Sequence, residues 1–496
     1  MTVAENNNQV VTFGCRLNAY ESEAIKKAVG DSGQKNLIVF NSCAVTSEAE
    51  RQLRQAVRRA RKDNPLAKIV VTGCAAQIDP EKYAKMAEVD LVLGNLEKSS
   101  AASYGEIAAM TENSASIAKY TSRNFHDKNS EKENNNAVEP LESSSHNHSA
   151  IHHHAISAEK KSDTQHQDKL FLDAKTAAAN FLTPDETAKI KVNDIMAVKD
   201  AAPQLVSYFE NKTRAFLEIQ NGCNHRCTFC IIPFGRGNSR SVAFGEIAAQ
   251  VKKMVEMGHK EVVLTGVDIS EYGQDLASPI SLSQMIKRLL VLVPQLPRLR
   301  LSSIDVAEID DGILDLIANE KRFMPYLHLS VQSGDDLILK RMARRHNRAQ
   351  VLEFCTKARQ LRPEITFGAD IIAGFPTETD EMFANSLSLI HEAGISFTHI
   401  FPYSKRSGTP AAKMPQLNGL VIKRRAKILR EAGEKELQKY LQQQIGKTLT
   451  VIVEKNNIAK SENFLDVKLI TEEKLNAGEI REIRVLAVEG NFLIAK

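Results

Sequence analysis

Residues 215–230 read Ala-Phe-Leu-Glu-Ile-Gln-Asn-Gly-Cys-Asn-His-Arg-Cys-Thr-Phe-Cys, an apolar run that leads directly into three closely spaced cysteines. The run Ala215–Gln220 predicts a strand, and the Asn-Gly pair after it predicts a turn. Cys223, Cys227 and Cys230 then form a C-x3-C-x2-C array. A loop of this length lets three thiolates face one point, so the spacing predicts a metal site at the carboxyl end of a strand.

Three thiolates suit a 4Fe–4S cube, because they ligate three irons and leave the fourth without a protein ligand, open to a substrate. Such clusters span roughly −700 to +450 mV, so a low-potential cluster could reduce a bound sulfonium. A structural zinc site is the alternative, with His225 as a recruited ligand, although zinc usually takes four ligands from two C-x2-C pairs. Unliganded or disulfide-bonded cysteines are the remaining alternative.

A second set of cysteines is spread along the first hundred residues. Cys15, Cys43 and Cys74 each lie within two or three residues of the end of a predicted strand. These strands are Val10–Phe13, Leu37–Phe40 and Ile69–Thr72. Carboxyl ends of parallel strands open on one edge of a sheet, so the three thiols should converge there. Gly14 and Gly73 let the backbone approach closely. Three unrelated buried cysteines are the alternative.

The composition is that of a soluble globular chain of several domains. Of 496 residues, 43% are hydrophobic and 25% charged, and no apolar run reaches the roughly 18 residues of a membrane span. Residues 1–9 show no basic stretch followed by an apolar one, which favours the cytoplasm over secretion. The net charge of +4 is too weak to argue for nucleic acid by itself.

The pattern of elements divides the chain into four segments. Residues 1–105 alternate the strands above, and Leu91–Leu93, with the helices Glu21–Val29 and Glu48–Arg61, which predicts a doubly wound parallel sheet. Residues 106–205 form a linker with a polar insertion at about 124–168 that we expect to be disordered. Its histidines could bind metal, but a polar linker needs no ligand role. They are His146, His148 and His152–His154.

Residues 206–440 contain six strand–helix units, which suit an open, partial (β/α)6 barrel with its active site at the carboxyl ends of the strands. The strands are Ala215–Gln220, Glu261–Thr265, Arg298–Ser302, Tyr326–Ser330, Thr366–Ile372 and Thr398–Phe401. Helical patterns include Ala243–Met257, Leu282–Leu292 and Ala349–Leu361. The seventh cysteine, Cys355, lies on the last of these and is expected to be a core thiol.

Residues 441–496 are predicted to form a small β-barrel of short strands. The strands are Leu449–Val453, Phe464–Leu469, Ile483–Val488 and Phe492–Ile494. The helix before this module, Val421–Gln444, is rich in Lys and Arg and could contact an RNA backbone by counterion release. A charged surface helix is the alternative.

The cysteine array at the end of the first barrel strand resembles the radical S-adenosylmethionine (SAM) superfamily. The segments Val11–Asn18 with Tyr20–Ser22, Asn41–Thr46 and Thr72–Gln77 resemble the amino-terminal domain of the methylthiotransferases, and the last module resembles the RNA-binding TRAM domain. The resemblance covers nearly the whole chain outside the insertion. Val306, where the family usually has Pro, and the insertion itself depart from the pattern without touching a cysteine.

The resemblance implies an enzyme that adds a methylthio group to tRNA with two 4Fe–4S clusters and two SAM molecules per product. One SAM would methylate sulfur at the amino-terminal cluster, and the other would give a 5′-deoxyadenosyl radical at the second. The segments Leu327–Asp336 and Lys340–His346 point to the subfamily that modifies carbon 2 of N6-threonylcarbamoyladenosine at position 37. Isopentenyladenosine in tRNA or a ribosomal-protein aspartate is the alternative substrate, and an iron–sulfur RNA-binding protein is the non-enzymatic alternative.

The same resemblance implies the site residues. Cys15, Cys43 and Cys74 would ligate one cluster and Cys223, Cys227 and Cys230 the other. Phe229 would flank the adenine of SAM, with core packing as the alternative, and Gln332 and Ser333 could touch SAM. Asp370 could as easily be a buried structural acid. Arg236 and Arg240 could hold a carboxylate or phosphate, or be solvated loop charges. An electron donor and a monomeric state are also expected.

Overall fold

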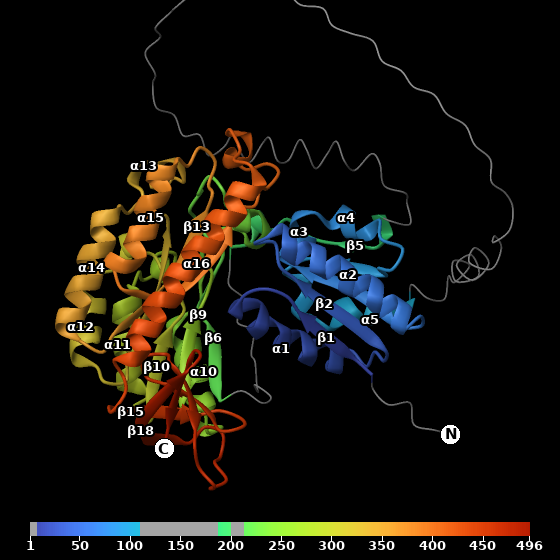
Figure 1. Ribbon diagram of the computed structural model, residues 1–496. Coiled ribbons are helices and arrows are strands. Elements are labelled where there is room, and N and C mark those ends of the chain that lie inside the picture. Colours follow the sequence, from blue (N-terminus) through green and yellow to red (C-terminus); the bar gives the residue numbers. More distant parts are fainter. Residues whose placement is uncertain (1–6, 110–186, 200–212) are drawn as a thin grey trace, which may run out of the picture. The chain divides into compact units, whose positions relative to one another are not determined.

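The computed structural model describes residues 7–109, 187–199 and 213–496 (Figure 1). The predicted disordered insertion at 124–168 and its histidines lie outside these residues. All of the sites described below belong to one compact unit, made up of residues 1–105 and 182–496. Residues 106–181 form a separate unit, of which the structure describes only the end of one helix.

The first sheet has five parallel strands in the order β1-β2-β3-β4-β5. These are β1 (Gln9–Thr12), β2 (Leu37–Ser42), β3 (Lys68–Gly73), β4 (Leu91–Leu93) and β5 (Ile190–Lys191), with helices α1 (Arg16–Asp31), α2 (Ser47–Asp63), α3 (Cys74–Ile78), α4 (Pro80–Ala84), η1 (Glu97–Ser99) and α5 (Ala101–Ala109). The predicted parallel α/β arrangement is confirmed. The winding differs from the expected doubly wound form, because the strands follow in chain order without a reversal.

Helix α2 begins where the loop after β2 ends, and its sequence fixes that point. The Thr46 side chain accepts a hydrogen bond from the Ala49 N–H and caps the helix. Glu48 and Glu50 occupy the first turn and Arg61 the last, which complements the helix dipole. The cap therefore sets the length of the segment that carries Cys43.

The central sheets confirm the predicted partial barrel. All six strand positions are parallel neighbours in chain order, and the third is broken at Ser302 into two short strands. The strands are β6 (Arg214–Glu218), β9 (Glu261–Thr265), β10 (Arg298–Leu301) with β11 (Ser303–Ile304), β12 (Tyr326–Gln332), β13 (Thr366–Ala373) and β14 (Ile395–Pro402). The main helices are α10 (Phe244–Glu256), α11 (Leu282–Leu292), α12 (Asp311–Asn319), α13 (Asp336–Arg341), α14 (Arg348–Leu361), α15 (Asp380–Glu392) and α16 (Gly419–Gln442).

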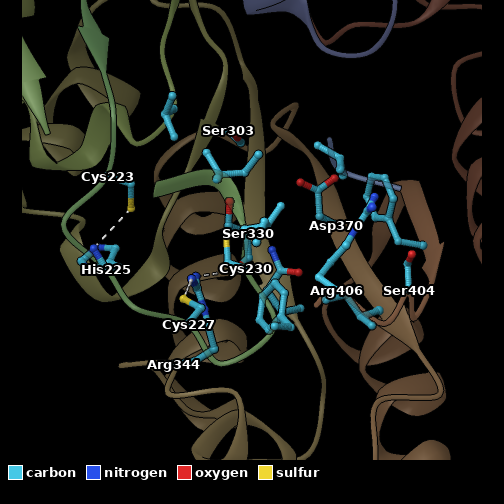
Figure 2. Close-up of a pocket in the computed structure, with 18 of the residues that line it drawn as sticks. Cys223, His225, Cys227, Cys230, Ser303, Ser330, Arg344, Asp370, Ser404 and Arg406 are labelled. Atoms are coloured by element: carbon cyan, nitrogen blue, oxygen red, sulfur yellow. Dashed lines mark hydrogen bonds between the residues drawn. The ribbon is translucent and has the colours of Figure 1, made fainter. Parts of the chain in front are cut away.

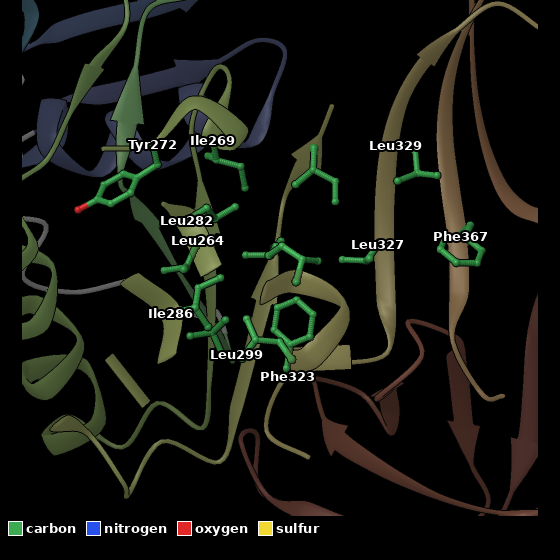
Figure 3. Close-up of a cluster of buried hydrophobic side chains, with 14 of the residues drawn as sticks. Leu264, Ile269, Tyr272, Leu282, Ile286, Leu299, Phe323, Leu327, Leu329 and Phe367 are labelled. Carbon is green, nitrogen blue, oxygen red and sulfur yellow. The ribbon is translucent and has the colours of Figure 1, made fainter. Parts of the chain in front are cut away.

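Apolar side chains of these strands pack against the surrounding helices. Figure 3 shows part of this cluster, in which Leu264, Leu299 and Leu327 come from successive strands and Ile286 comes from α11. Cys355 on α14 is fully buried in the same cluster, as predicted. The core holds the strands in register and leaves their carboxyl ends to carry polar residues.

The last module is a closed five-stranded barrel, as predicted. Its strands are β15 (Thr448–Val453), β16 (Ile458–Ser461), β17 (Asp466–Leu469), β18 (Ile480–Glu489) and β19 (Phe492–Ala495). Strand β16 was not predicted, because it is short and carries few strand-forming residues. Two buried arginines of β10 attach this module to the central barrel by hydrogen bonds. Arg298 donates to the Thr450 carbonyl (2.9 Å), and Arg300 donates to the Glu462 carbonyl (3.0 Å) and to Glu261 (2.8 Å).

Leu329 tests the central core. It is fully buried on β12, so Leu329→Ala should lower the free energy of unfolding by about 2–5 kcal/mol in denaturant melts, through lost burial and a cavity. Leu420→Ala is the matched control, because Leu420 is 75% exposed at the start of α16 and its truncation should cost less than about 1 kcal/mol. Equal effects of the two substitutions would contradict the packing described.

Candidate active site

The loop with three cysteines is shaped by a glycine turn at its start and by backbone hydrogen bonds. Gly222 takes a φ of +75°, and a Cβ there would lie 1.9 Å from the Asn238 carbonyl oxygen, so this turn requires glycine. The Cys223 N–H donates to the Gly237 carbonyl (3.1 Å), and the Cys230 N–H donates to the Cys227 carbonyl (3.0 Å). The strand and the turn therefore present the array as a compact loop.

This loop forms one wall of a cavity of about 310 Å³ at the carboxyl ends of the barrel strands. Figure 2 shows the cysteine loop on one side of the cavity and Ser404 and Arg406 on the other. The lining includes all three cysteines, Asp268 after β9, Ser303 on β11, Ser330 on β12, Asp370 on β13 and Tyr403 after β14. Val45 and Thr46, from the loop after β2, also line it, so the first sheet contributes to the same cavity.

The surroundings of these thiols suit metal ligation. Arg344 Nη1 lies 3.6 Å from Cys227 Sγ and would stabilise a thiolate there. Burial raises the pKa of Cys230 to about 12, and burial together with the Asp268 carboxylate raises the pKa of Cys223 further. As free thiols these two would stay protonated at neutral pH, whereas a bound metal deprotonates its cysteine ligands. Ligation, rather than nucleophilic attack, is the chemistry that the loop supports.

Zinc has a possible set of ligand atoms at one end of this loop. Cys223, His225 and Asp268 offer atoms within 4.8 Å of one another, and His225 Nε2 lies 2.9 Å from Asp268. That set uses one cysteine and leaves Cys227 and Cys230 facing the cavity. A three-cysteine cluster uses the whole array and fits the loop better.

The other predicted SAM contacts take different positions. Phe229 lines the cavity and also packs edge-on against Phe375, with ring centroids 6.5 Å apart, so its ring is part of the core as well as of the cavity wall. Gln332 lines the cavity with a φ of +67°, which is rare outside glycine. The neighbouring Ser333 is fully buried instead, and its hydroxyl lies 3.2 Å from that of Ser386. Ser333 therefore supports the turn before α13 and does not line the cavity.

Asp370 lines the cavity, and two histidines contact its carboxylate. Its Oδ1 lies 2.8 Å from His328 Nε2 and 3.3 Å from His399 Nδ1. Burial works against the carboxylate, but these two imidazoles outweigh it and hold the pKa of Asp370 well below its usual range. The residue is both a structural acid and part of the cavity wall.

The structure brings the first set of cysteines together at the edge of the first sheet. Cys15 precedes α1, Cys43 follows β2, and Cys74 begins α3. Burial is the main cause that raises the pKa of Cys43 to about 12, and the sulfurs of Cys74 and Cys15 add to it, which reflects their closeness. Gly14 has a φ of +94°, and a Cβ on it would lie 2.5 Å from Cys43 Sγ.

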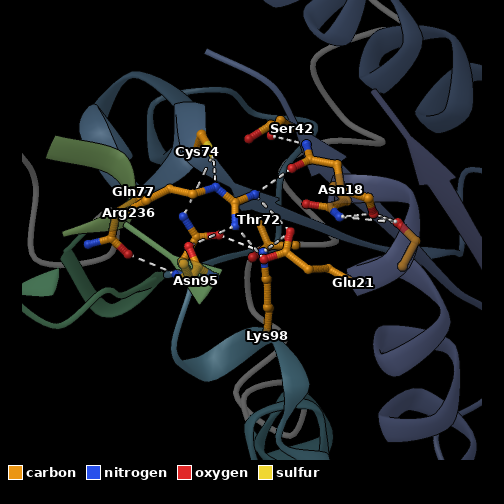
Figure 4. Close-up of polar contacts among 12 residues, drawn as sticks. Asn18, Glu21, Ser42, Thr72, Cys74, Gln77, Asn95, Lys98 and Arg236 are labelled. Carbon is orange, nitrogen blue, oxygen red and sulfur yellow. Dashed lines mark hydrogen bonds and ion pairs between the residues drawn. The ribbon is translucent and has the colours of Figure 1, made fainter. Parts of the chain in front are cut away.

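Arg236 joins this set to the barrel (Figure 4). It ends α9 (Ile232–Arg236), which follows the cysteine loop, and it is 3% exposed. Its Nε donates to Cys74 Sγ (3.1 Å), and its Nη1 and Nη2 donate to the two carboxylate oxygens of Glu21 (2.6 and 2.9 Å). Nη2 also donates to Asn18 Oδ1 (2.6 Å). The carboxylate that Arg236 holds is thus one of the chain's own.

Glu21 stays ionised inside this network. Burial alone would raise the pKa of its carboxyl, but Arg236 and the ammonium of Lys98, 2.7 Å away, outweigh burial and lower the pKa to about 2. A carboxylate held by two cations and a bidentate fork is the arrangement in which a buried ion pair is retained. Arg240, by contrast, donates to the carbonyls of Asn238 and Arg236 and braces the loop.

Several polar residues of the cavity were not predicted. Asp268, Asp305, Arg344 and Arg406 all face it, and Asp305 pairs with Arg344 at 2.8 Å. Asp268 and Asp305 come just after the carboxyl ends of barrel strands. The cysteines were predicted from the same position relative to strands, so this pattern would also have predicted the two aspartates. Arg406 carries no comparable pattern.

Comparison with known proteins agrees with this site. The family model described as Radical SAM superfamily matches residues 217–390, and the model of the uncharacterized protein family UPF0004 matches residues 7–94. The fold and the site define a radical SAM enzyme of the tRNA methylthiotransferase class, which uses SAM and 4Fe–4S clusters.

Two relatives in the comparison identify the subfamily of methylthiotransferases to which the chain belongs. The chain is 46% identical to the threonylcarbamoyladenosine tRNA methylthiotransferase MtaB of Rickettsia prowazekii, over 99% of this chain and 98% of that protein. It is 33% identical to the MtaB of Aquifex aeolicus, over 92% and 95%. The chain belongs to the MtaB family of methylthiotransferases. A solved structure of the radical SAM methyltransferase TsrM from Kitasatospora setae, covering 82% of this chain and 76% of that one, is too remote to argue from (TM-score 0.46, 11% identity).

No helix within the described residues combines the length and the apolar character needed to cross a membrane.

Gly14→Ala should damage the first cysteine set selectively. The added Cβ would collide with Cys43 in a backbone conformation that alanine resists, so reconstituted protein should carry about four irons per chain instead of about eight. Gly30→Ala on α1 is the control, since its Cβ would meet nothing within 4 Å and it should keep all irons. Full iron content in Gly14→Ala would show that the close approach is not needed.

Arg236→Gln should destabilise the metal-free chain by about 3–5 kcal/mol in denaturant melts, because it strips a buried carboxylate of its bidentate partner. Arg236→Lys keeps the charge but loses the fork, so its effect should be smaller. Arg51→Gln is the matched control, as Arg51 pairs with Glu48 at the surface with its side chain 54% exposed. A loss in Arg236→Gln no larger than the control's would contradict the network.

Proposed function

We propose that this enzyme adds a methylthio group to carbon 2 of N6-threonylcarbamoyladenosine at position 37 of tRNA. The observation that carries the proposal is the convergence of two cysteine sets, Cys15, Cys43 and Cys74 on one sheet edge and Cys223, Cys227 and Cys230 on another. Residues adjoining the first set line the cavity of the second. One substrate atom could therefore meet chemistry from both.

In this proposal, each set of cysteines holds one 4Fe–4S cluster. The clusters with SAM would supply the radical that removes hydrogen from the adenine and the methylated sulfur that replaces it. Arg344 and Arg236 donate to ligand sulfurs and keep them in place. Phe229 and Gln332 form cavity wall where an adenine could lie. The three acids of the cavity, Asp268, Asp305 and Asp370, each lie beside an arginine or histidine of the chain.

The nucleoside follows from the relatives. The two most similar relatives named above carry the threonylcarbamoyladenosine activity in their names, at 46% and 33% identity. A tRNA-2-methylthio-N(6)-dimethylallyladenosine synthase of Neorickettsia sennetsu is 29% identical. We infer the threonylcarbamoyl substrate from this order.

The partners follow from the same reasoning. The substrate is tRNA, and exposed Lys423, Arg424 and Lys435 on α16, with the terminal barrel, are candidate contacts for its backbone. An electron donor must deliver the reducing electron. We propose a cytoplasmic, monomeric enzyme.

The test is to replace each of the six cluster cysteines with Ala and complement a strain that lacks the enzyme. Mass spectrometry of tRNA nucleosides should show no 2-methylthio-N6-threonylcarbamoyladenosine in any of the six. Each purified variant should hold about four irons rather than eight after anaerobic reconstitution. Product from any of the six variants would defeat the assignment of that cysteine.

Cys355→Ala provides the matched control. Cys355 is the seventh cysteine and is buried in α14 away from both sets, so this variant should keep both clusters and full product. If the wild-type strain instead accumulates the methylthio derivative of isopentenyladenosine, the enzyme class stands and the nucleoside is wrong.

A further inference from the structure

Arg406 lines the cavity, and two of its donors have no partner among the described residues. Its Nη1 is bound to Glu50 of α2, which also accepts from Lys82 at 2.5 Å. Its Nε and Nη2 are buried, and among the described residues neither has a hydrogen-bond partner. A buried charged donor without a partner is costly, so two on one guanidinium indicate a missing ligand.

The cavity's own acids do not supply that ligand. Asp268 is paired with His225 (2.9 Å) and Asp305 with Arg344 (2.8 Å). Asp370 is paired with His328 (2.8 Å). Since each carboxylate already has its own arginine or histidine partner, none of the three is bound to Nε or Nη2 of Arg406.

The geometry of that edge selects a class of ligand. Nε and Nη2 lie on the same edge of the planar guanidinium and form a fork with two parallel N–H bonds, which matches the spacing of two oxygens of a carboxylate or phosphate. Glu50 on the remaining nitrogen fixes the plane of the group. Arg406 is thereby oriented in advance for a planar or tetrahedral oxyanion.

We propose that the Nε/Nη2 edge of Arg406 binds an anionic group of the tRNA substrate beside the reacting adenine. This inference rests on the proposed function and deepens it. Two anions of the substrate share this chemistry: the carboxylate of the threonyl substituent and a backbone phosphate next to the modified nucleoside. Arg406 is in this view a substrate-binding residue, and Glu50 positions it.

The experiment measures binding of three anticodon stem-loop RNAs to the reconstituted holoenzyme by fluorescence anisotropy. One RNA carries N6-threonylcarbamoyladenosine, one carries the methyl ester of its carboxylate, and one carries plain adenosine. Arg406→Gln should raise the Kd of the first RNA about tenfold to a hundredfold, as expected when a charged hydrogen-bonding pair is lost. Arg406→Lys should fall between, because it keeps the charge without the fork.

The three RNAs identify which anion is bound. A penalty confined to the first RNA assigns the carboxylate, and an equal penalty on all three assigns a phosphate. Lys405→Gln is the control for net charge, because Lys405 is the exposed neighbour and its loss should change each Kd by less than about threefold. Wild-type affinity of Arg406→Gln for all three RNAs would overturn the inference.

Two further readouts keep the result interpretable. If Arg406→Gln does not fold, Arg406→Lys carries the test, and its unchanged affinity for every RNA is then the overturning result. Turnover of the first RNA by the wild-type holoenzyme is measured separately. Failure of that turnover would refute the proposed nucleoside, whereas normal turnover with no effect of Arg406 variants would refute only the anion site.

Discussion

The buried ion pair between Arg236 and Glu21 is the contact on which the rest of the site depends. Arg236 stands six positions after the last cysteine of the barrel loop, yet it donates to Cys74 of the first sheet. One short segment therefore connects the two sets of cysteines. A buried pair is retained only with good geometry, and here the fork, Lys98 and Asn18 satisfy its charges. These side-chain contacts hold the two sets of cysteines next to each other.

Much of this structure could be predicted, because apolar runs in the sequence predict the strands of a parallel sheet. The residues just after these strands then lie together at one edge of the sheet. That rule located Cys15, Cys43 and Cys74 although they are far apart in the sequence. It could not give the strand order of the first sheet, which depends on how each crossover packs, so the doubly wound expectation was wrong in that respect. Nor could it separate Gln332 from Ser333, because adjacent residues of a strand end point to opposite sides.

Arg406 was beyond sequence reasoning for a different reason. Its partner Glu50 lies 356 positions away, and its importance comes from two nitrogens that no other side chain reaches in the described part of the chain. A sequence motif can identify a residue type at a site. A donor without a hydrogen-bond partner can be recognised only in the three-dimensional structure. The boundaries of the four segments and the expected disorder of the insertion remain predictions.

The arginines at the foot of the barrel have a consequence for size selection. Arg298 and Arg300 fasten the terminal barrel at the start of the strands, whereas the cysteine loop opens at their far end. Strand β13 has 8 residues and spans about 26 Å, which sets the scale of this separation. A molecule that contacts both ends must therefore be at least about 26 Å long. Under the proposed function, a tRNA is long enough to contact both the cavity and the terminal barrel, whereas a free nucleoside is too short to reach both.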